Sequence, residues 1–469
     1  MNSVPMELAR LAAEEGGRAY YVGGCVRDRL LGRGSKDIDI EVHGIGPEAL
    51  FELLKKIGEP LSYGESFGIY SLKGLDIDIA MPRTEAKTGR GHKDFQVCVD
   101  PFIGTREAAR RRDFTVNALM EDILTGEIID HFGGMQDLQS KVLRHVDDES
   151  FPEDPLRVLR GAQFASRFGF SVAPETMALF RQIPLDSLSR ERVEEELKKA
   201  LLQGVQPSIF FEVLREADAL DVWFPLLKKL LFVEQDPIFH PEGNVWIHTM
   251  EVLDRGAACR DKVSDPYSFG LLCLAHDLGK LMTTAVGKDG RLHAYGHETE
   301  GLPLIEEFLG KLTAETRVKG YVLNMTALHM KPNVIAYRKS AVKTTNKMFD
   351  DAAAPADLIY FALADRPVVS GTERFTGDSQ FLFERLAVYE ETMSRPYVKG
   401  SDLIKAGLKP GPDFSGYLEF AHKLRLAGIE KESALKQTLA MAGKAIKKEN
   451  HGKQQNESGD QNGKETGRK

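Results

Sequence analysis

The sequence predicts a multidomain chain in which an α/β domain is followed by helical domains. Up to about residue 140, short apolar or alternating runs that suit strands are mixed with runs at helical spacing, as in a mixed sheet covered by helices. From about residue 150 onward, apolar residues recur mainly at helical spacing. A length of 469 residues exceeds one ordinary core and fits about three domains.

The composition is that of a globular protein, with 42% hydrophobic and 28% charged residues. We expect no transmembrane helix and no signal peptide, because no apolar stretch approaches ~20 residues and the N-terminus lacks a basic-then-apolar layout. The cysteines are scattered without a CxxC motif, which predicts a reducing cytoplasm without disulfides or a zinc ribbon. They are Cys25, Cys98, Cys259 and Cys273. The net charge of −8 excludes a uniformly basic nucleic-acid binder but allows a local basic face.

The most informative stretch near the start reads YYVGGCVRDRLLGRGSKDIDIE. Its first part predicts a buried strand, a tight glycine turn and a short helix. The KDIDIE part predicts a second strand that places Asp37 and Asp39 on one face, where paired carboxylates suit Mg²⁺. Gly23 and Gly24 would let the backbone approach a phosphate, and Arg27 could pair with it. Taken alone, the two aspartates also fit a polar strand end.

Two further strings carry candidate binding residues. RRRDFTVNAL contains three successive arginines, which could pair with a triphosphate or an RNA backbone or could simply be a solvated run. In EDPLRVLR, Asp154 and Pro155 suit a helix start, and Arg157 and Arg160 share one helix face. Arginines on an otherwise apolar helix need partners, so this face is either a binding surface or a salt-bridged one.

The string GGCVRDRLLG…KDIDI resembles the catalytic head of the class II nucleotidyltransferases, which are the CCA-adding enzymes of bacteria and eukaryotes and the bacterial poly(A) polymerases. This resemblance implies a nucleotidyltransferase head in which Asp37 and Asp39 are catalytic and hold Mg²⁺. It adds Asp78, on a strand just before Arg83-Thr84-Glu85, as the third carboxylate. Gly23, Gly24 and Arg27 would then bind the nucleotide.

RRDFTVNAL is similar to a second signature of this family, which implies that Arg111 and Arg112 bind the nucleotide, supported by Asp113 and Asn117. The segment 130–134 resembles the family's hinge between head and neck. Residues 88–109 resemble its flexible loop, which we expect to be long and mobile. The loop looks full length, which favours addition of the complete CCA end.

EDPLRVLR resembles the motif that serves this family as a protein template for base selection. Cytosine and adenine both present an exocyclic amine beside an unprotonated ring nitrogen, so a carboxylate can accept from one and a guanidinium can donate to the other. Uracil and guanine would leave these groups unpaired. The resemblance therefore assigns base selection to Asp154 and Arg157, with Arg160 in support.

Histidines become frequent after about residue 239. An adjacent His-Asp pair, with histidines before and after it and a later aspartate, is better explained as a metal-ligand set than as a group of core residues. The pattern resembles the HD superfamily of metal-dependent phosphohydrolases, which is all-helical. The resemblance implies core ligands His248, His276, Asp277 and Asp365, with His297 and His329 for a second metal or a phosphate. Lys280 is a weak candidate for phosphate binding.

The resemblance thus implies a tRNA nucleotidyltransferase that adds CCA from CTP and ATP without a nucleic-acid template. We expect Mg²⁺ in the head and a transition metal of unknown identity in an HD domain with phosphatase or 2′,3′-cyclic phosphodiesterase activity. Alternatives are an enzyme that adds only CC or only A, a poly(A) polymerase, a nucleotide-sensing hydrolase and an inactive HD domain. We expect no membrane partner and either a monomer or a homodimer. The expected segments are a head (1–140), a helical neck and body (141–235), an HD domain (236–395), a helical tail (396–446) and a disordered end (447–469).

Overall fold

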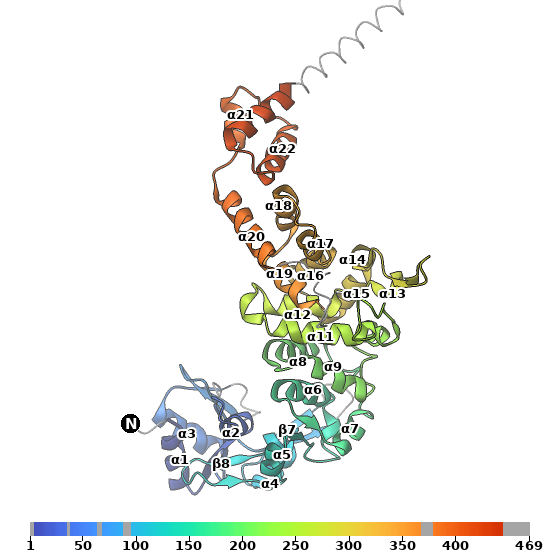
Figure 1. Cartoon of the computed structure of the whole chain (residues 1–469). Helices are drawn as coiled ribbons and strands as arrows, with labels where there is room; N and C mark the ends of the chain where they lie inside the picture. Colours follow the sequence, from blue (N-terminus) through green and yellow to red (C-terminus); the bar gives the residue numbers. More distant parts are fainter. Residues whose placement is uncertain (1–3, 35–37, 63–67, 88–94, 367–378, 444–469) are drawn as a thin grey trace, which may run out of the picture. The chain divides into compact units, whose positions relative to one another are not determined.

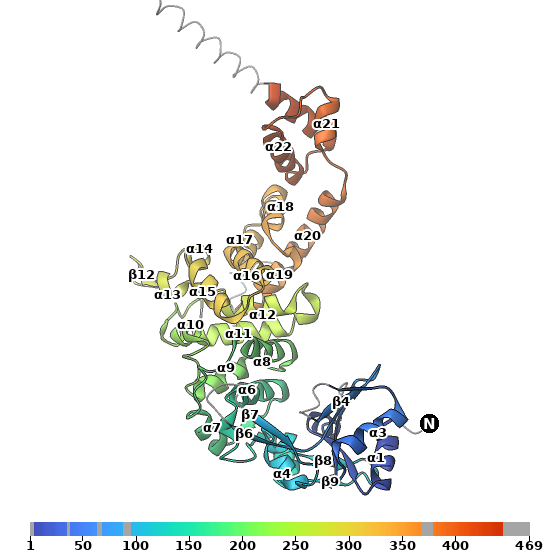
Figure 2. The same ribbon diagram turned by 180° about the vertical axis from the view of Figure 1, so that it is seen from behind.

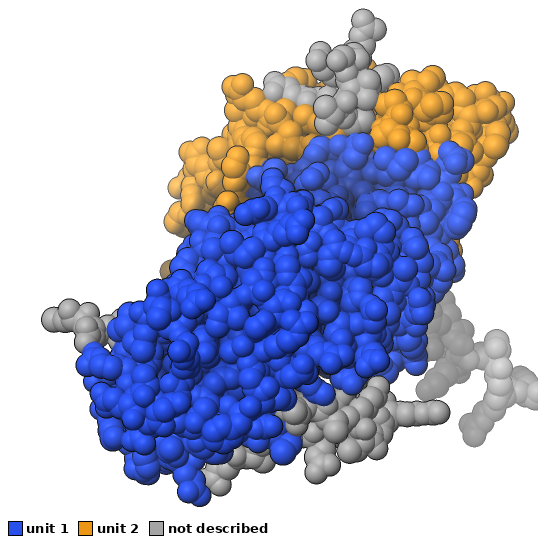
Figure 3. Space-filling view, turned by 90° about the horizontal axis from the view of Figure 1, so that it is seen from below, with its two compact units in different colours: residues 1–234, 244–260, 303–316 blue, residues 235–243, 261–302, 317–469 orange. Residues whose placement is uncertain are grey.

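A computed structural model describes the chain except for residues 1–3, 35–37, 63–67, 88–94, 367–378 and 444–469 (Figure 1). The chain divides into two compact units. Unit 1 comprises residues 1–234, 244–260 and 303–316, and unit 2 comprises residues 235–243, 261–302 and 317–469 (Figure 3). The segment 447–469, expected to be disordered, lies outside the described residues. Among the described helices, none combines the length and the apolar character needed to cross a membrane.

Within the described residues, the head of unit 1 contains a seven-stranded mixed sheet in the order β3-β4-β5-β2-β1-β8-β9. Only β2 and β5 pair in parallel, and the other described neighbours are antiparallel. The strands are β1 (Arg18–Val22), β2 (Ile38–His43), β3 (Pro60–Ser62), β4 (Ile69–Leu72), β5 (Ile77–Ala80), β8 (Met120–Asp122) and β9 (Ile128–Ile129). This sheet confirms the predicted α/β head.

Helices α1 (Val4–Glu14) and α3 (Pro47–Ile57) bury their apolar faces against this sheet. Leu8 from α1 and Leu50 from α3 join Ile40 and Ile79 of the central strands in one core. Alternation along β2 and β5 places the polar residues between these apolar ones on the opposite face. The sheet therefore presents Asp39 and Asp78 away from the α1–α3 core.

The segment 88–109, expected to be a loop, is partly regular. Strand β6 (Arg83–Lys87) pairs antiparallel with β7 (Phe95–Val99), and helix α4 (Thr105–Arg110) follows. The expectation of an irregular loop was therefore wrong for residues 95–99 and 105–109. The alternating FQVCV run does suit a strand. The tip of this hairpin lies outside the described residues.

The rest of unit 1 is mostly helical. Its longer helices are α6 (Leu156–Phe168), α7 (Pro174–Phe180), α8 (Arg190–Gln203), α9 (Ser208–Glu216), α11 (Val245–Ala257) and α15 (Leu302–Leu312, whose first residue belongs to unit 2). Helix α6 packs against α8 and α9. Helix α8 follows Ser189 and ends just before Gly204. Gly204 lies tightly against the Ala200 carbonyl and the Ser166 hydroxyl, where a side chain would clash.

Unit 2 is built from helices, with one small hairpin of β12 (Ala285–Val286) and β13 (Leu292–His293) (Figure 2). Its described helices include α12 (Pro266–Ala275), α13 (Lys280–Thr283), α14 (His297–Glu300), α16 (Thr316–Leu328), α17 (Lys331–Tyr337), α18 (Val342–Asp351), α19 (Pro355–Ala364), α20 (Ser379–Ser394), α21 (Gly400–Lys405) and α22 (Phe414–Leu426). In the C-terminal part, Leu403 and Tyr417 form a small separate core with Ala442.

Candidate functional sites

The turn after β1 brings a guanidinium over the sheet. Gly23 has a φ of 71°, a left-handed conformation that favours glycine, and it precedes α2 (Gly24–Leu30). A Cβ at Gly23 would lie 2.7 Å from Nη1 of Arg112 and 3.8 Å from Oδ2 of Asp39. Glycine at this position therefore lets the Arg112 guanidinium and the Asp39 carboxylate converge over the turn.

Two of the three expected carboxylates are neighbours. Asp39 on β2 and Asp78 on β5 are register partners in the parallel pair, so their side chains point to the same face. Asp39 is half-buried and Asp78 is exposed. Asp37 lies outside the described residues. Two adjacent carboxylates repel each other in the absence of a cation, and hard oxygen ligands of this kind fit a divalent ion such as Mg²⁺.

Sequence reasoning missed a third acidic side chain on this face. Glu41 is buried, accepts a hydrogen bond from His43 at 2.7 Å and lies 3.5 Å from Nη2 of Arg112. Burial alone would raise its pKa, but the bond from His43 and the charge of Arg112 hold the pKa below the ordinary 4.5. Glu41 thus stays ionised and fixes Arg112 beside the carboxylate pair. The signal was available, since Glu41 continues the alternation of Asp39 along the strand.

A buried polar relay connects the head to helix α6. The Arg27 guanidinium, only 3% exposed, donates to the Asn117 side chain and to Asp28. Asn117 in turn donates to Asp113 at 2.9 Å, and Asp113 forms an ion pair with Arg160 at 2.7 Å. Four of the predicted nucleotide-binding residues therefore form one connected network. In this structure the donors of Arg27 face protein partners.

Aromatic rings of α6 complete this junction. The Arg27 guanidinium lies 4.5 Å from the Phe168 ring centroid and 5.0 Å from that of Phe164. Arg160 also lies over Phe164, at 5.2 Å. Such cation–π contacts gain strength when desolvated. The junction between α2 and α6 is therefore held by charge and ring contacts as well as by apolar packing.

The two residues expected to select the base lie one helical turn apart but bind different partners. Asp154 accepts from the Leu156 amide, as a helix cap does, and from Nη2 of Arg192 at 2.9 Å. Arg157 donates to the carbonyl oxygens of Ser150 and Arg111, at 2.8 and 2.7 Å. Sequence reasoning missed Arg192, which lies on α8.

The segment expected to be a hinge caps a helix. Asp130 accepts hydrogen bonds from the amides of Phe132, Gly134 and Met135 ahead of α5 (Gly134–Ser140). A Cβ at Gly134 would lie 2.2 Å from the Thr115 carbonyl oxygen, so glycine permits this close approach. The structure therefore provides a packing reason for Gly134.

The second candidate site is a buried cluster in unit 2. Asp277, His297 and His329 each offer one ligand atom, and these atoms lie within 4.8 Å of one another. Nε2 of His297 lies 3.2 Å from both Nε2 of His329 and Oδ1 of Asp277. His276 adds its Nε2 at 3.2 Å from Asp277 and 3.4 Å from Asp365. His276 and Asp277 directly follow α12, and His297 begins α14. His329 and Asp365 directly follow α16 and α19.

The orientation of the histidines is typical of metal ligands. Each Nδ1 contacts the carbonyl oxygen three residues earlier, at 3.1 Å for His276, 2.8 Å for His297 and 2.7 Å for His329. A carbonyl oxygen only accepts, so Nδ1 carries the proton and Nε2 of a neutral ring presents a lone pair. Lone pairs on His297 and His329 converge beside a carboxylate. This donor set therefore fits a divalent cation.

The charges within the cluster also favour a bound cation. Burial would lower the pKa of His276, but Asp277 and Asp365 outweigh it and raise the pKa to about 10. Burial and the nearby His276 lower the pKa of His329 to about 4, so that ring is neutral and available as a ligand at pH 7. Asp277 and Asp365 thus stabilise a positive charge at this position, as they would the charge of a bound cation.

The structure also describes the two remaining predicted residues of this set, Lys280 and His248. Lys280 is buried and donates to Asp277 at 2.8 Å and to Gln235 at 2.7 Å. His248 is buried on α11, which belongs to unit 1. Close packing also shapes this region, because a Cβ at Gly279 would lie 2.0 Å from the His297 carbonyl oxygen.

Comparison with known proteins defines the class of the head. The family model "Poly A polymerase head domain" matches residues 19–144, and "Probable RNA and SrmB- binding site of polymerase A" matches residues 169–231. A Thermotoga maritima CCA-adding enzyme complexed with tRNA has the same fold, with a TM-score of 0.62, 22% identity and coverage of 93% of this chain and 94% of that one. The head is thus a nucleotidyltransferase head, a class that requires a divalent metal.

Two curated relatives identify the family of the whole chain. The Multifunctional CCA protein of Methylobacillus flagellatus is 40% identical over 329 residues, which is 69% of this chain and 76% of that protein. The protein of the same name from Aromatoleum aromaticum is 42% identical over 288 residues, which is 60% of this chain and 67% of that protein. The chain belongs to the multifunctional CCA protein family.

Proposed function

We propose that the head adds C, C and A to the 3′ end of tRNA, using CTP and ATP, without a nucleic-acid template. The observation that carries this proposal is the register pairing of Asp39 with Asp78, beside an Arg112 guanidinium that Gly23 admits. Carboxylates for a divalent ion next to a donor for phosphate are what in-line nucleotidyl transfer requires. Membership of the multifunctional CCA protein family supports the choice of tRNA over other acceptors.

In this proposal Asp39 and Asp78, together with Asp37, hold Mg²⁺. A bound Mg²⁺ would lower the pKa of the attacking 3′-hydroxyl and offset the charge of the triphosphate. Arg112 donates to the triphosphate from over the turn, and Glu41 keeps its guanidinium in place. Arg111 contributes its charge from the adjacent position. Pyrophosphate is the leaving group.

Base selection falls to Asp154 and Arg157. A carboxylate offers about four lone-pair sites, so the Asp154 oxygens can accept from a base amine while Arg192 holds them in position. Arg157 donates to the ring nitrogen. Arg160 acts through Asp113 and Asn117, whose network fixes α6 against the head.

The buried cluster supports a second function, hydrolysis of a phosphoester. His276, Asp277, His297, His329 and Asp365 are an imidazole and carboxylate set that suits a divalent transition metal. A bound metal would activate water for attack on phosphorus. Lys280 holds Asp277 through its ammonium group. We propose phosphatase or 2′,3′-cyclic phosphodiesterase activity for this site.

The proposal assigns these functions to the segments 1–140, 141–235 and 236–395, with 396–446 as a helical tail. We also propose that the protein works in the cytoplasm. The scattered cysteines without a CxxC motif are typical of a reducing compartment.

The test is incorporation of labelled nucleotide into tRNA transcripts that end before the first C, after CC, or with complete CCA. CTP and ATP are supplied separately and together, with Asp39→Ala as the inactive control. Completion of CCA followed by a stop is the expected result. Addition of only CC or only A would move the protein to a partial-adding enzyme, and an unbounded A tail would make it a poly(A) polymerase.

A further inference from the structure

The β12–β13 hairpin of unit 2 presents an aromatic stack to solvent. The rings of His293 and Tyr295 have centroids 4.8 Å apart and planes 11° from parallel. Tyr295 is 79% exposed, an unusual state for a large aromatic side chain. One face of its ring lies on His293 and most of the remainder meets water. A flat ligand can therefore extend this stack.

The inner ring of the stack is held in place by its surroundings. Nε2 of His293 lies 2.9 Å from both oxygens of Asp289. A Cβ at Gly287 would lie 2.5 Å from Cδ2 of His293, so only glycine leaves room for this ring. A stacking surface that is already ordered loses little entropy on binding.

The stack lies next to the metal-ligand cluster along the chain. Tyr295 precedes His297 by two residues, so their Cα atoms are at most about 7 Å apart. Gly296 between them has a φ of 76°, and His297 begins α14. A phosphoester bound at the cluster would therefore have its organic part close to this hairpin.

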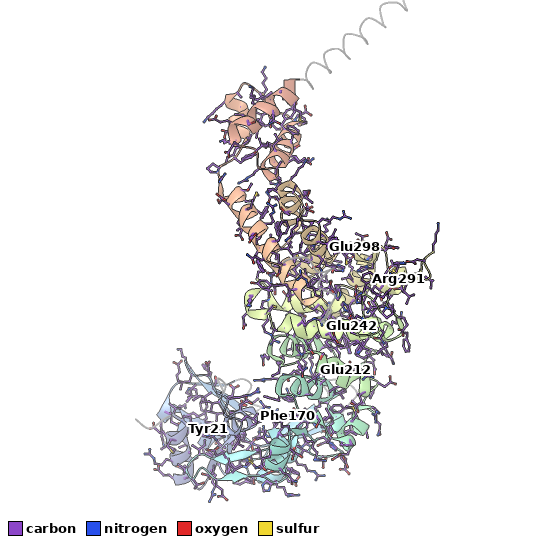
Figure 4. The ribbon with its side chains drawn as sticks, in the orientation of Figure 1. Tyr21, Phe170, Glu212, Glu242, Arg291 and Glu298 are labelled. Atoms are coloured by element: carbon purple, nitrogen blue, oxygen red, sulfur yellow. The ribbon has the colours of Figure 1, made fainter. Side chains whose placement is uncertain are left out.

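The remaining surroundings favour a nucleotide over a purely apolar ligand. Arg291 lies on the same hairpin (Figure 4). It donates to Asp236 at 2.6 Å, and its guanidinium lies over the Phe239 ring at 5.1 Å. Lys288 at the tip is exposed. Because Asp236 offsets the charge of Arg291, the Lys288 ammonium is the positive group that this hairpin offers to a phosphate. A basic group beside an open aromatic face is the combination by which proteins bind single nucleotides of a strand.

We infer that Tyr295, backed by His293, stacks on the nucleobase of a nucleoside phosphate whose phosphate is hydrolysed at the cluster. This inference rests on the proposed phosphohydrolase function. Tyr295 is then a substrate-binding residue that gives this site a preference for nucleoside phosphates over phosphoesters without a base.

The test compares adenosine 2′-monophosphate with glycerol 2-phosphate, which has no base, as substrates of the full-length metal-loaded protein. Tyr295→Ala should raise KM for the nucleotide about tenfold, since stacking on one base is worth roughly a factor of ten or more. It should change kcat for the nucleotide by no more than about twofold. The kcat and KM for glycerol 2-phosphate should likewise change by no more than about twofold. Tyr295→Phe, which keeps an aromatic ring, should have the same KM for the nucleotide as the unaltered protein. Tyr337→Ala on α17, where the tyrosine is 65% exposed, is the matched control. Equal effects on both substrates, or none, would overturn the inference.

A binding measurement separates this inference from the proposed function. If the unaltered protein hydrolyses neither substrate, the phosphohydrolase proposal fails. Stacking of a base on Tyr295 is then tested separately by fluorescence. Tyr295→Trp adds an exposed tryptophan to the buried Trp223 and Trp246. Adenosine 2′-monophosphate should quench its emission and glycerol 2-phosphate should not, with Tyr337→Trp unaffected by either. Absence of selective quenching at millimolar nucleotide would rule out the stack.

Discussion

The two candidate metal sites of this chain are built in opposite ways. In the head, Asp39 and Asp78 stand on neighbouring strands with one side chain exposed and the other half-buried. In unit 2, Asp277, His297 and His329 are buried and converge from helices. A site that must admit a triphosphate and a polynucleotide end has to be open. A buried set of neutral imidazoles instead suits an ion that stays bound.

The strongest test of this contrast is a reciprocal pair of substitutions. Asp39→Ala should lower nucleotide incorporation about a thousandfold or more, because it removes a carboxylate that we propose as a metal ligand. It should leave phosphoester hydrolysis unchanged. His297→Ala should lower phosphoester hydrolysis and leave nucleotide incorporation unchanged. Both activities are measured on each variant, with the exposed Glu48→Ala as a control. Loss of both activities in either variant would contradict two independent sites.

Gly23→Ala tests whether the turn of the open site must admit a guanidinium. The added methyl group would displace Arg112, and kcat/KM for CTP should fall roughly 10–100-fold. Gly32→Ala is the matched control, because Gly32 has a similar φ of 69° but no atom within 4 Å of its Cβ position. Similar losses in both variants would attribute the effect to backbone strain alone.

Metal removal should separate the open site from the buried one in time. On addition of EDTA, nucleotide incorporation should stop within seconds and return when Mg²⁺ is added. Phosphoester hydrolysis should decay at least about tenfold more slowly, because ligands buried on several helices must open before the ion leaves. Elemental analysis after gel filtration should find metal in the unaltered protein and less in His329→Ala. If EDTA abolished both activities at the same rate, the two sites would not differ in how slowly they release the metal.

The smallest effect is expected at the buried relay that joins the head to α6. Asp113→Asn should lower stability by about 2 kcal/mol at pH 7, less than a fully buried pair because the Arg160 side chain is 34% exposed. The pKa of Asp113 lies below its ordinary 3.8, since Arg160 and the bonds from Asn117 and Phe114 outweigh burial. Its contribution is therefore present above pH 3.8 and is lost as the pH falls through the lower, folded-state pKa.

Thermal melts across this range check the prediction. The unaltered chain should lose stability on acidification below about pH 4 more steeply than Asp113→Asn, so that the two melting curves approach each other. A gap that stays constant down to pH 2 would show that Asp113 does not titrate in this way.

Local patterns predicted much of the fold. The strand, glycine turn and helix around Gly23 follow from an apolar run and two glycines. Period-two alternation also placed Asp39 on the correct strand. These features depend on neighbours in the chain, which a sequence displays directly.

Long-range contacts were the part that sequence could not supply. The Asp154–Arg192 pair joins the start of α6 to α8, and nothing local to either residue indicates the other. The relay from Arg27 through Asn117 spans 90 positions, and its burial depends on rings of α6. The β6–β7 hairpin was missed for a different reason, because its glycine and charge content is typical of loops.

Helix α6 carries Arg157 and Arg160 near one end and the rings that cover Arg27 near the other. At 13 residues it is a rod of about 20 Å, which sets a fixed spacing between the arginines proposed for base selection and the glycine turn that Arg27 follows. Inserting one residue between Arg160 and Phe164 would turn the following side chains by about 100° and carry the rings off Arg27. Over evolution this helix can therefore accept substitutions far more readily than changes of length.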